Sequence, residues 1–340
     1  MREQRRLRIL WSATLAWLAL LFATLALFGL VGERAWPVVL LLYLPRLPWI
    51  IPGVLLLPLA LHRGRRVLLV PLAVGALLWT FPLMGFVLPL PASRPQGPTF
   101  RLMSYNTTQL VDGVEGIRSL IFSAHPDLVL FQWTSHLADE ALSGAGFDGW
   151  TVRRAAQFTV ASRFPILSVE AVGVPSGSGP PCAHAVVVTP LGPLDVFDIR
   201  PQSARMEIAA NRHLGLRQRL RQLVQNARSG RLSEHAALRE AQIQSIAEAI
   251  AKARYPVVIA GDTNLPQGSF LLLHYFGNFQ DAFREAGSGF GFTHPAKWPW
   301  LRLDRVLLGP GLAAASFQVL SRGASAHRPI LAEISRAPSR

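Results

Sequence analysis

The 340-residue chain is poor in several residue types, and each shortage excludes a structural feature or a class of protein. It has a single cysteine, Cys182, so no intrachain disulfide framework can form. Acidic residues are scarce, with 20 Asp and Glu against 34 Lys and Arg, which gives a formal net charge of +14. Mean hydropathy is nevertheless positive, at +0.30. A strongly basic and apolar chain of this kind does not have the composition of an ordinary soluble enzyme.

Charge and apolar character separate along the chain. Residues 1–97 contain ten Arg and two acidic residues in an otherwise mostly apolar sequence. Residues 98–340 are a mixture with 24 basic and 18 acidic residues, long enough for one large domain with a substantial core. Pro91, Pro95 and Pro98 form a short, stiff connection between the two parts. The sequence therefore predicts a membrane region at 1–97 and a soluble domain at 98–340.

Three apolar segments of the first part are candidate transmembrane helices, at 9–32, 38–62 and 67–90. The first would span about 36 Å as a helix and is too long for the apolar core of a signal peptide. The second is interrupted by Pro45, Arg46, Pro48 and Pro52, so it is either a kinked span or a short interfacial piece before a span.

The basic residues around these segments predict the orientation of the chain in an inner or plasma membrane. Arginines cluster before the first segment and between the second and third, and both clusters fit the cytoplasmic side. Three spans then place residues 98–340 outside the cytoplasm. If segment 38–62 does not cross, the same domain is cytoplasmic.

The stretch 257–264, Val-Val-Ile-Ala-Gly-Asp-Thr-Asn, is the most informative part of the soluble domain. A β-branched apolar run predicts a buried strand that ends in Asp262 and Asn264. Alternate residues of a strand face the same side, so both side chains should point into one cleft. A carboxylate beside an amide suits a hydrated Mg²⁺ and a phosphate oxygen. The alternative is a strand that stops at an ordinary Asp-Asn turn.

Other segments of the domain predict several strands in adjacent pairs and few helices, which favours an α+β sandwich. The predicted helices are 113–123 and a long helical region at 204–253. The predicted strands are 100–106, 127–132, 150–153, 158–162, 183–188, 194–200, 257–262, 302–308, 317–320 and 329–334.

Six short motifs occur in a fixed order: Ser-Tyr-Asn106, Pro-Asp-Leu-Val-Leu-Phe-Gln132, Ser-Arg-Phe-Pro165, Gly-Asp-Thr-Asn264, Arg-Leu-Asp304 and Ala-His-Arg-Pro329. Together they resemble the endonuclease/exonuclease/phosphatase superfamily over essentially all of 98–336. The resemblance implies a four-layer αββα sandwich, with two packed mixed β-sheets flanked by helices after the transmembrane helices. It also implies a metal–phosphate cleft at the strand ends.

Five positions match the superfamily's functional residues. The resemblance assigns Asn106 and Asp262 to the metal, and Asp262 and Asn264 to orienting the attacking water and holding phosphate. It assigns Asp304 to orienting His327. The expected catalytic set is therefore Asp262, Asn264, Asp304 and His327.

Three positions depart from the superfamily's pattern. Trp133 stands where the resemblance implies a glutamate metal ligand, and Ala326 replaces a second carboxylate. Arg200 stands at a position usually held by histidine, and it can still bind phosphate as a bidentate donor. Mg²⁺ needs anionic oxygen ligands, which neither an indole nor a methyl group supplies. We therefore expect weak metal binding.

Two functions remain open on this basis. One is a membrane-anchored ligand-binding or regulatory pseudo-hydrolase without a cofactor. The other is an active divalent-metal phosphoesterase of the phosphodiesterase, nuclease or phosphatase type that uses Mg²⁺ or Mn²⁺ with rearranged ligands. The expected partners are the lipid bilayer and a phosphorylated or anionic lipid ligand, with nucleic acid less favoured.

The segment 200–254 has eleven basic and four acidic residues. It is either a flank that binds anionic lipid or a solvated helix face. The Trp298-Pro299-Trp300 run is either an aromatic rim of the cleft or a packed loop.

Overall fold

The computed structural model describes residues 2–62, 66–88, 97–108, 113–134, 137–177, 179–203, 218, 221, 225–226, 230–320 and 325–338. The chain forms two compact units. A helical unit comprises Met1–Phe86 together with Gln267–Phe270, and a larger unit comprises Val87–Pro266 and Leu271–Arg340.

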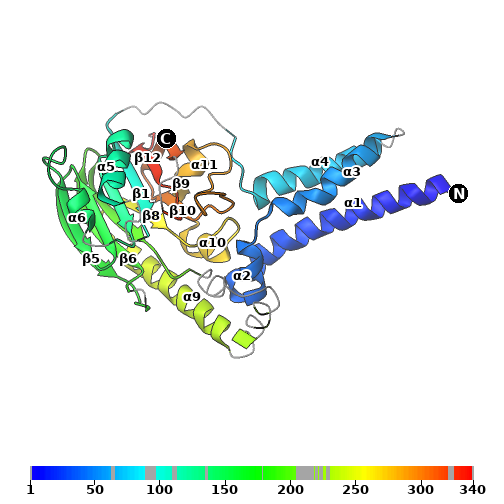
Figure 1. Cartoon of the computed structure of the whole chain (residues 1–340), viewed down its shortest axis with the longest axis horizontal. Helices are drawn as coiled ribbons and strands as arrows, with labels where there is room; N and C mark the ends of the chain where they lie inside the picture. The colour runs from blue at the N-terminus through cyan, green and yellow to red at the C-terminus, as the bar shows by residue number, and fades with distance from the viewer. Residues whose placement is uncertain are drawn as a thin grey trace. The chain divides into compact units, whose positions relative to one another are not determined.

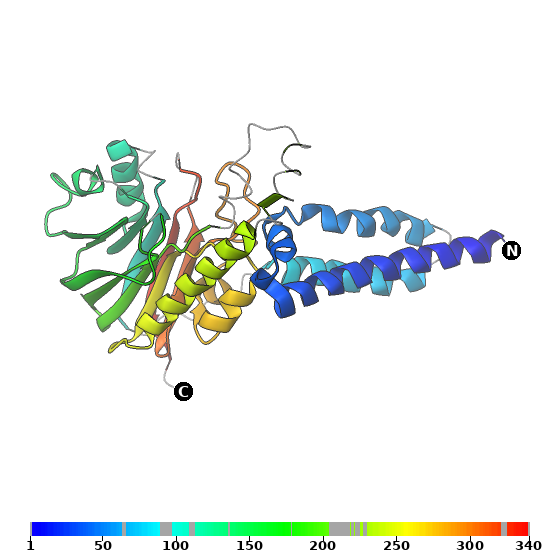
Figure 2. The same cartoon turned by 90° about the horizontal axis from the view of Figure 1, so that it is seen from below.

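Three helices of the helical unit, α1, α3 and α4, lie side by side (Figures 1 and 2). Their close approach depends on two glycines, because a Cβ at Gly53 or Gly75 would lie 2.4 or 2.3 Å from the ring of Trp17. The elements of this unit are α1 (Arg2–Ala26), η1 (Leu27–Val31), η2 (Gly32–Arg34), α2 (Trp36–Tyr43), η3 (Leu47–Ile50), α3 (Ile51–Leu61), η5 (Arg66–Leu68), α4 (Leu69–Leu78) and η6 (Trp79–Leu83).

Two helices among the described residues are long and apolar enough to cross a membrane, Glu3–Arg34 and Arg66–Leu83. The second predicted span is broken instead, because Trp36–Tyr43 and Leu47–Leu61 meet at an angle of 84°. The break lies at Pro45, whose ring cannot continue a helix. The count is therefore two spans, or three if the bent pair is one span.

Two charged residues of the helical unit are buried and bind the segment Gln267–Phe270. The Glu33 carboxylate accepts the Ser269 hydroxyl and, at 3.1 Å, the Phe270 backbone N–H. The Arg46 guanidinium donates to the Gln267 carbonyl at 2.6 Å. Both residues are at most 5% exposed, so these contacts satisfy charges that would be costly inside an apolar unit.

The larger unit is built on two mixed six-stranded sheets, which confirms the α+β sandwich. Strands β1 and β2 are parallel in the first sheet and β7 and β8 in the second, and the other pairs are antiparallel. The first sheet has the order β11 (Leu312–Val319), β12 (Ile330–Arg336), β1 (Thr99–Asn106), β2 (Leu128–Gln132), β4 (Phe158–Ser162), β3 (Thr151–Ala155). The second has the order β5 (Ile166–Val172), β6 (Cys182–Thr189), β7 (Gly192–Ile199), β8 (Val257–Asp262), β10 (Asp304–Leu308), β9 (Gln280–Asp281).

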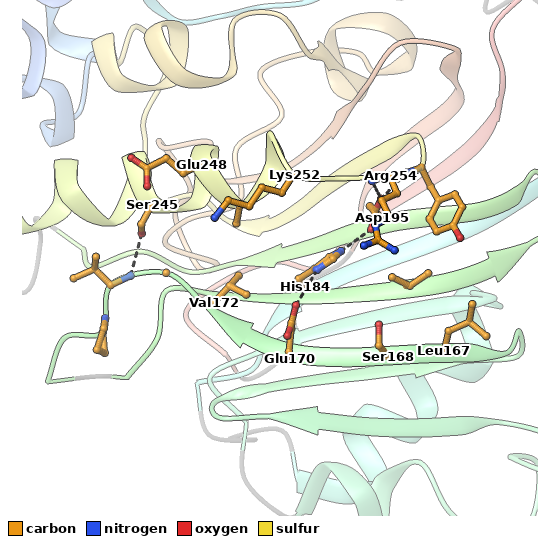
Figure 3. Close-up of a pocket in the computed structure, with 16 residues that line it drawn as sticks. Leu167, Ser168, Glu170, Val172, His184, Asp195, Ser245, Glu248, Lys252 and Arg254 are labelled. Atoms are coloured by element: carbon orange, nitrogen blue, oxygen red, sulfur yellow. Dashed lines mark hydrogen bonds and ion pairs between the residues drawn. The ribbon is translucent and has the colours of Figure 1, made fainter.

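Helices cover the outer faces of the packed sheets. The apolar faces of α5 (Gly113–Ala124) and α6 (Leu137–Ala141) pack on the first sheet. The helix α9 (Arg231–Ile250) runs along the second sheet (Figures 2 and 3). Two shorter helices, α10 (Phe270–Phe276) and α11 (Ala282–Ala286), follow β8 in the chain.

Alternation along the central strands decides where the polar side chains go. In β1, Phe100 and Leu102 face the core between the sheets, whereas Met103 and Tyr105 face the helices. The row between the sheets continues to Asn106 at the strand's carboxyl end. The corresponding rows of the other strands place Gln132 at the end of β2, Asp198 near the end of β7, Asp262 at the end of β8 and Asp304 at the start of β10.

Most predicted strands agree with the structure to within a few residues. Strands β5 and β9 were not predicted, and β11 begins earlier than the predicted 317–320. Half of β5 is exposed, so it lacks the apolar run that identifies a buried strand. In the predicted helical region 204–253, residues 231–250 form α9, and most of 204–229 lies outside the described residues.

Candidate functional site

Asp262 is the centre of a buried polar cluster at the ends of the central strands. Its Oδ2 atom accepts the Asn106 side-chain amide at 2.9 Å and that of Asn264 at 3.1 Å, and its Oδ1 accepts the Asn264 backbone N–H at 3.1 Å. The contact with Asn106 joins the two sheets. Asn264 has a φ of +49°, a left-handed conformation that asparagine tolerates. The predicted convergence of Asp262 and Asn264 is therefore observed.

Asp304 and His327 form a second pair beside Asp262. The Nδ1 atom of His327 lies 2.9 Å from Asp304 Oδ2, and its Nε2 lies 3.6 Å from Asp262 Oδ2. Strand register places Asp304 directly opposite Asp262. Burial raises the pKa of Asp304, the charge of Asp262 adds to the rise, and His327 opposes it. The imidazole therefore lies between two carboxylates that are both about 1% exposed.

Two further residues support His327, and the sequence analysis did not single them out for this. Ser325 donates its hydroxyl to the Asn106 carbonyl at 2.7 Å and accepts the His327 backbone N–H at 3.2 Å. The ring of His294 lies 4.6 Å from that of His327, centroid to centroid. The serine lies directly before the Ala-His-Arg-Pro329 motif, and this position was the available signal, whereas His294 is 33 residues away from His327 in the chain. Ala326, between Ser325 and His327, offers no side-chain ligand to a metal.

Two of the departing residues, Trp133 and Arg200, contact each other. The Arg200 guanidinium lies 4.3 Å from the centroid of the Trp133 ring, within the range of a cation–π contact. Its NH1 donates to Gln157 Oε1 at 2.7 Å. Trp133 itself has a φ of +54°. These contacts fix a positive charge at the carboxyl end of β7, one residue beyond the strand.

Gln132 and Asp198 make another bridge between the sheets. The Gln132 amide donates to Asp198 Oδ1 at 2.6 Å, and both side chains are fully buried. Burial raises the pKa of Asp198 well above its usual range, and the bond from Gln132 only partly opposes this. The other oxygens, Gln132 Oε1 and Asp198 Oδ2, have no hydrogen-bond partner among the described residues. Burial therefore favours the protonated form of Asp198.

The cluster offers an incomplete set of metal ligands. Asp262, Asp304 and His327 present three ligand atoms within 4.8 Å of one another. Both carboxylates already accept hydrogen bonds, and the Asn106 side chain donates to Asp262 and accepts the Thr108 N–H at 3.2 Å. Mg²⁺ favours oxygen ligands, so this set of two carboxylates and an imidazole fits it only in part.

Comparison with known proteins identifies the family. The profile of the Endonuclease/Exonuclease/phosphatase family matches residues 103–327. The chain belongs to this family. Enzymes of the endonuclease/exonuclease/phosphatase family are typically dependent on a divalent metal, and the three-ligand group described above is a candidate for it. No curated protein matches the chain significantly.

Solved structures share the fold at low sequence identity. A humanized TDP2 of D. rerio is similar, with 15% identity and a TM-score of 0.51 over 70% of this chain and 99% of that one. A functionally unknown conserved protein from Enterococcus faecalis is also similar, with 14% identity and a TM-score of 0.50 over 70% of this chain and 100% of that one. At these identities the likeness shows the fold of this family member and not its substrate.

A groove of about 880 Å³ lies elsewhere on the unit, between α9 and the outer face of β5, β6 and β7 (Figure 3). At its floor, His184 Nε2 lies 2.7 Å from Asp195 Oδ1, and Glu170 Oε1 lies 3.5 Å from the histidine's Nδ1. Asp195 Oδ2 accepts the backbone N–H groups of Arg254 and Tyr255 at 2.8 and 2.7 Å. None of the predicted site residues, all of which are described, lines this groove. The hydrogen bonds of Asp195 therefore connect β6 and β7 to the segment that precedes β8.

Proposed function

We propose that residues 98–340 form a phosphate-recognising domain, carried by a membrane region at 1–97, whose metal site is degraded. On this proposal the protein is a ligand-binding or regulatory pseudo-hydrolase. The observation that carries it is the Arg200 guanidinium stacked on Trp133, 4.3 Å from the ring centroid. A fixed cation thus lies beside the position where the family resemblance implies an anionic metal ligand.

The proposed ligand is a phosphate ester. Arg200 supplies charge-assisted donors of fixed orientation, which suits the planar, bidentate recognition of phosphate. Asn264 lies at the same strand ends, with its amide bound to Asp262 and to the Pro201 carbonyl at 2.9 Å. The carboxylates of Asp262 and Asp304 lie next to these groups and would repel a phosphate anion. The ligand should therefore bind at the edge of the cluster, on the side of Arg200.

The rival function is metal-dependent phosphoester hydrolysis, and the three ligand atoms of Asp262, Asp304 and His327 favour it. Asp262, with Asn106, would hold a single Mg²⁺ or Mn²⁺, which would supply Lewis-acid activation of a phosphoryl oxygen, and the Nε2 atom of His327 would stay free of the metal. His327, held by Asp304 at 2.9 Å, can accept a proton at Nε2 from an attacking water.

One experiment separates the two functions. The full chain in detergent is titrated calorimetrically with Mg²⁺ and Mn²⁺, and assayed with bis-p-nitrophenyl phosphate and p-nitrophenyl phosphate in each metal. We expect no heat of metal binding in the micromolar range and no turnover. Hydrolysis that requires the metal and disappears in Asp262→Ala would establish the rival function instead.

We further propose that the domain is extracytoplasmic and that its ligand is the phosphate-bearing headgroup of an anionic lipid. The arginine clusters around the apolar segments support this orientation, and the membrane-spanning helices keep the domain beside a bilayer. The basic segment 200–254, most of whose first half lies outside the described residues, supports an anionic partner. In nanodiscs, anionic lipid should compete with a soluble phosphate ester and zwitterionic lipid should not. Equal competition by both lipids would contradict a headgroup ligand.

A further inference from the structure

Arg239, in the middle of α9, is a buried cation that the proposed site does not yet use. The residue is 2% exposed. Its Nε and NH2 atoms have no hydrogen-bond partner, and no ion pair to it occurs within the part of the chain that the structure describes. Arginine keeps its positive charge inside proteins. A buried charge without a partner is strongly destabilising, so an anion bound next to this guanidinium would stabilise the fold.

The neighbours of Arg239 on the helix locate it relative to the site. His235 and Gln242 are four residues before and three after it, and therefore lie on the same face of α9. Both hydrogen-bond to Gln202: the Gln202 backbone N–H donates to Gln242 Oε1 at 2.8 Å, and its side-chain Nε2 lies 3.0 Å from His235 Nδ1. Arg239 thus faces the turn that contains Gln202.

That turn continues β7 at the edge of the candidate site. Gln202 lies two residues after Arg200, and the carbonyl of the intervening Pro201 accepts the Asn264 side chain at 2.9 Å. The chain of contacts therefore leads from the Asp262 cluster through Asn264 and Pro201 to the face of α9 that carries Arg239. Arg200 begins this turn, and Arg239 lies on the helix face whose neighbouring residues contact it.

We infer that Arg239 binds a phosphate group of the ligand, in addition to the one proposed at Arg200. Gln202 Oε1 is also buried and has no hydrogen-bond partner among the described residues. Arg239 therefore offers two unpartnered N–H donors, and Gln202 offers an unpartnered acceptor. A hydrogen phosphate group has oxygens for the guanidinium and a hydroxyl for the amide oxygen, whereas sulfate at neutral pH has no such hydroxyl.

The inference rests on the proposed function, because it assigns the second anion to the same ligand. It narrows the ligand to a molecule with two phosphate groups, either joined or on one scaffold. A lipid headgroup and a free metabolite can both carry this chemistry.

The test measures how inorganic phosphate protects the fold of the full chain in detergent. Cys182 is fully buried and is the chain's single cysteine, so its labelling rate by a thiol reagent in moderate urea reports opening of the larger unit. Phosphate should slow labelling of the wild type, and sulfate should do so less. In Arg239→Gln the apparent affinity for phosphate should fall about tenfold or more, as expected when a charge-assisted hydrogen bond is lost. Arg239→Lys should retain most of the affinity.

Two matched variants make the outcome decisive. Lys252→Gln removes an exposed positive charge just after α9 and should leave phosphate protection unchanged. Arg200→Gln tests the proposed function separately: protection lost in Arg239→Gln but kept in Arg200→Gln supports the second anion site and rejects the first. Protection that survives in Arg239→Gln, or that is absent from the wild type, overturns the inference. A merely structural arginine would show faster labelling with the phosphate effect intact.

Discussion

Gly261, in the Gly-Asp-Thr-Asn motif, is a residue at which a single added methyl group should strongly lower the free energy of unfolding. It pairs with Ile199 across the parallel β7–β8 ladder and has a φ of +133°. A Cβ at this position would lie 2.2 Å from the Ile199 carbonyl oxygen and 2.8 Å from its nitrogen. The obstacle is backbone, which cannot rotate away as a side chain could.

The magnitude of the Gly261→Ala effect follows from two costs. Alanine at this φ costs about 1–3 kcal/mol in backbone strain. Separating β7 from β8 by about 1 Å, to restore normal contact, costs about 1–3 kcal/mol more by analogy with overpacked cores. We therefore expect a loss of about 2–6 kcal/mol in the free energy of unfolding of the larger unit. That is a large part of the roughly 5–15 kcal/mol typical of a domain.

The labelling rate of Cys182 in the full chain provides the assay. Cys182 pairs with Ile199 on β7, and burial raises the pKa of its thiol well above the usual value, so labelling requires opening. A loss of about 2–6 kcal/mol should speed labelling by roughly 30-fold to 10⁴-fold, at about 1.4 kcal/mol for each factor of ten. Gly311→Ala is the control, because Gly311 has a φ of +83° but nothing within 4 Å of its Cβ position. Equal labelling of the two variants would refute the steric reasoning.

Three further predictions concern the site and the topology. Burial raises the pKa of Asp198, so the wild type loses stability as pH rises above about 4, where the unfolded chain releases a proton that the folded chain keeps, until the pH passes the folded pKa. Asp198→Asn should therefore gain stability relative to the wild type as pH rises from 4 to 8 in urea titrations, and a pH-independent difference would contradict the raised pKa of Asp198. Trp133→Glu with Ala326→Asp should raise Mg²⁺ affinity about tenfold or more by calorimetry, because each adds an anionic oxygen ligand; unchanged affinity would mean that the restored carboxylates do not reach the ion. A periplasm-specific reporter fused after Arg340 should be active, whereas an active cytoplasm-specific reporter at the same position would exclude the extracytoplasmic orientation.

Local periodicity predicted most of the strands and the convergence of Asp262 and Asn264, whereas the four-layer sandwich and the positions of Asn106, Asp304 and His327 were predicted by the resemblance to the superfamily. Period-two alternation in β1 and β8 fixes which face each side chain takes, so Asn106 and Asp262 had to end rows that point between the sheets. The resemblance then predicted that Asp304 and His327 lie at the same edge. Their assigned roles in catalysis and metal binding remain predictions.

Contacts between distant elements were beyond the reach of the sequence. The stack of Arg200 on Trp133, and the bridge from Gln132 to Asp198, depend on how two sheets pack, and no local pattern encodes that distance. In the sequence, Arg239 is only one basic residue among eleven in segment 200–254. The sequence pattern of a helix does not show whether solvent or the turn after a strand contacts this face. Burial of that one guanidinium was decided by the docking of α9 against the turn at Gln202. Local sequence determines which way a side chain points, and tertiary packing determines what it meets.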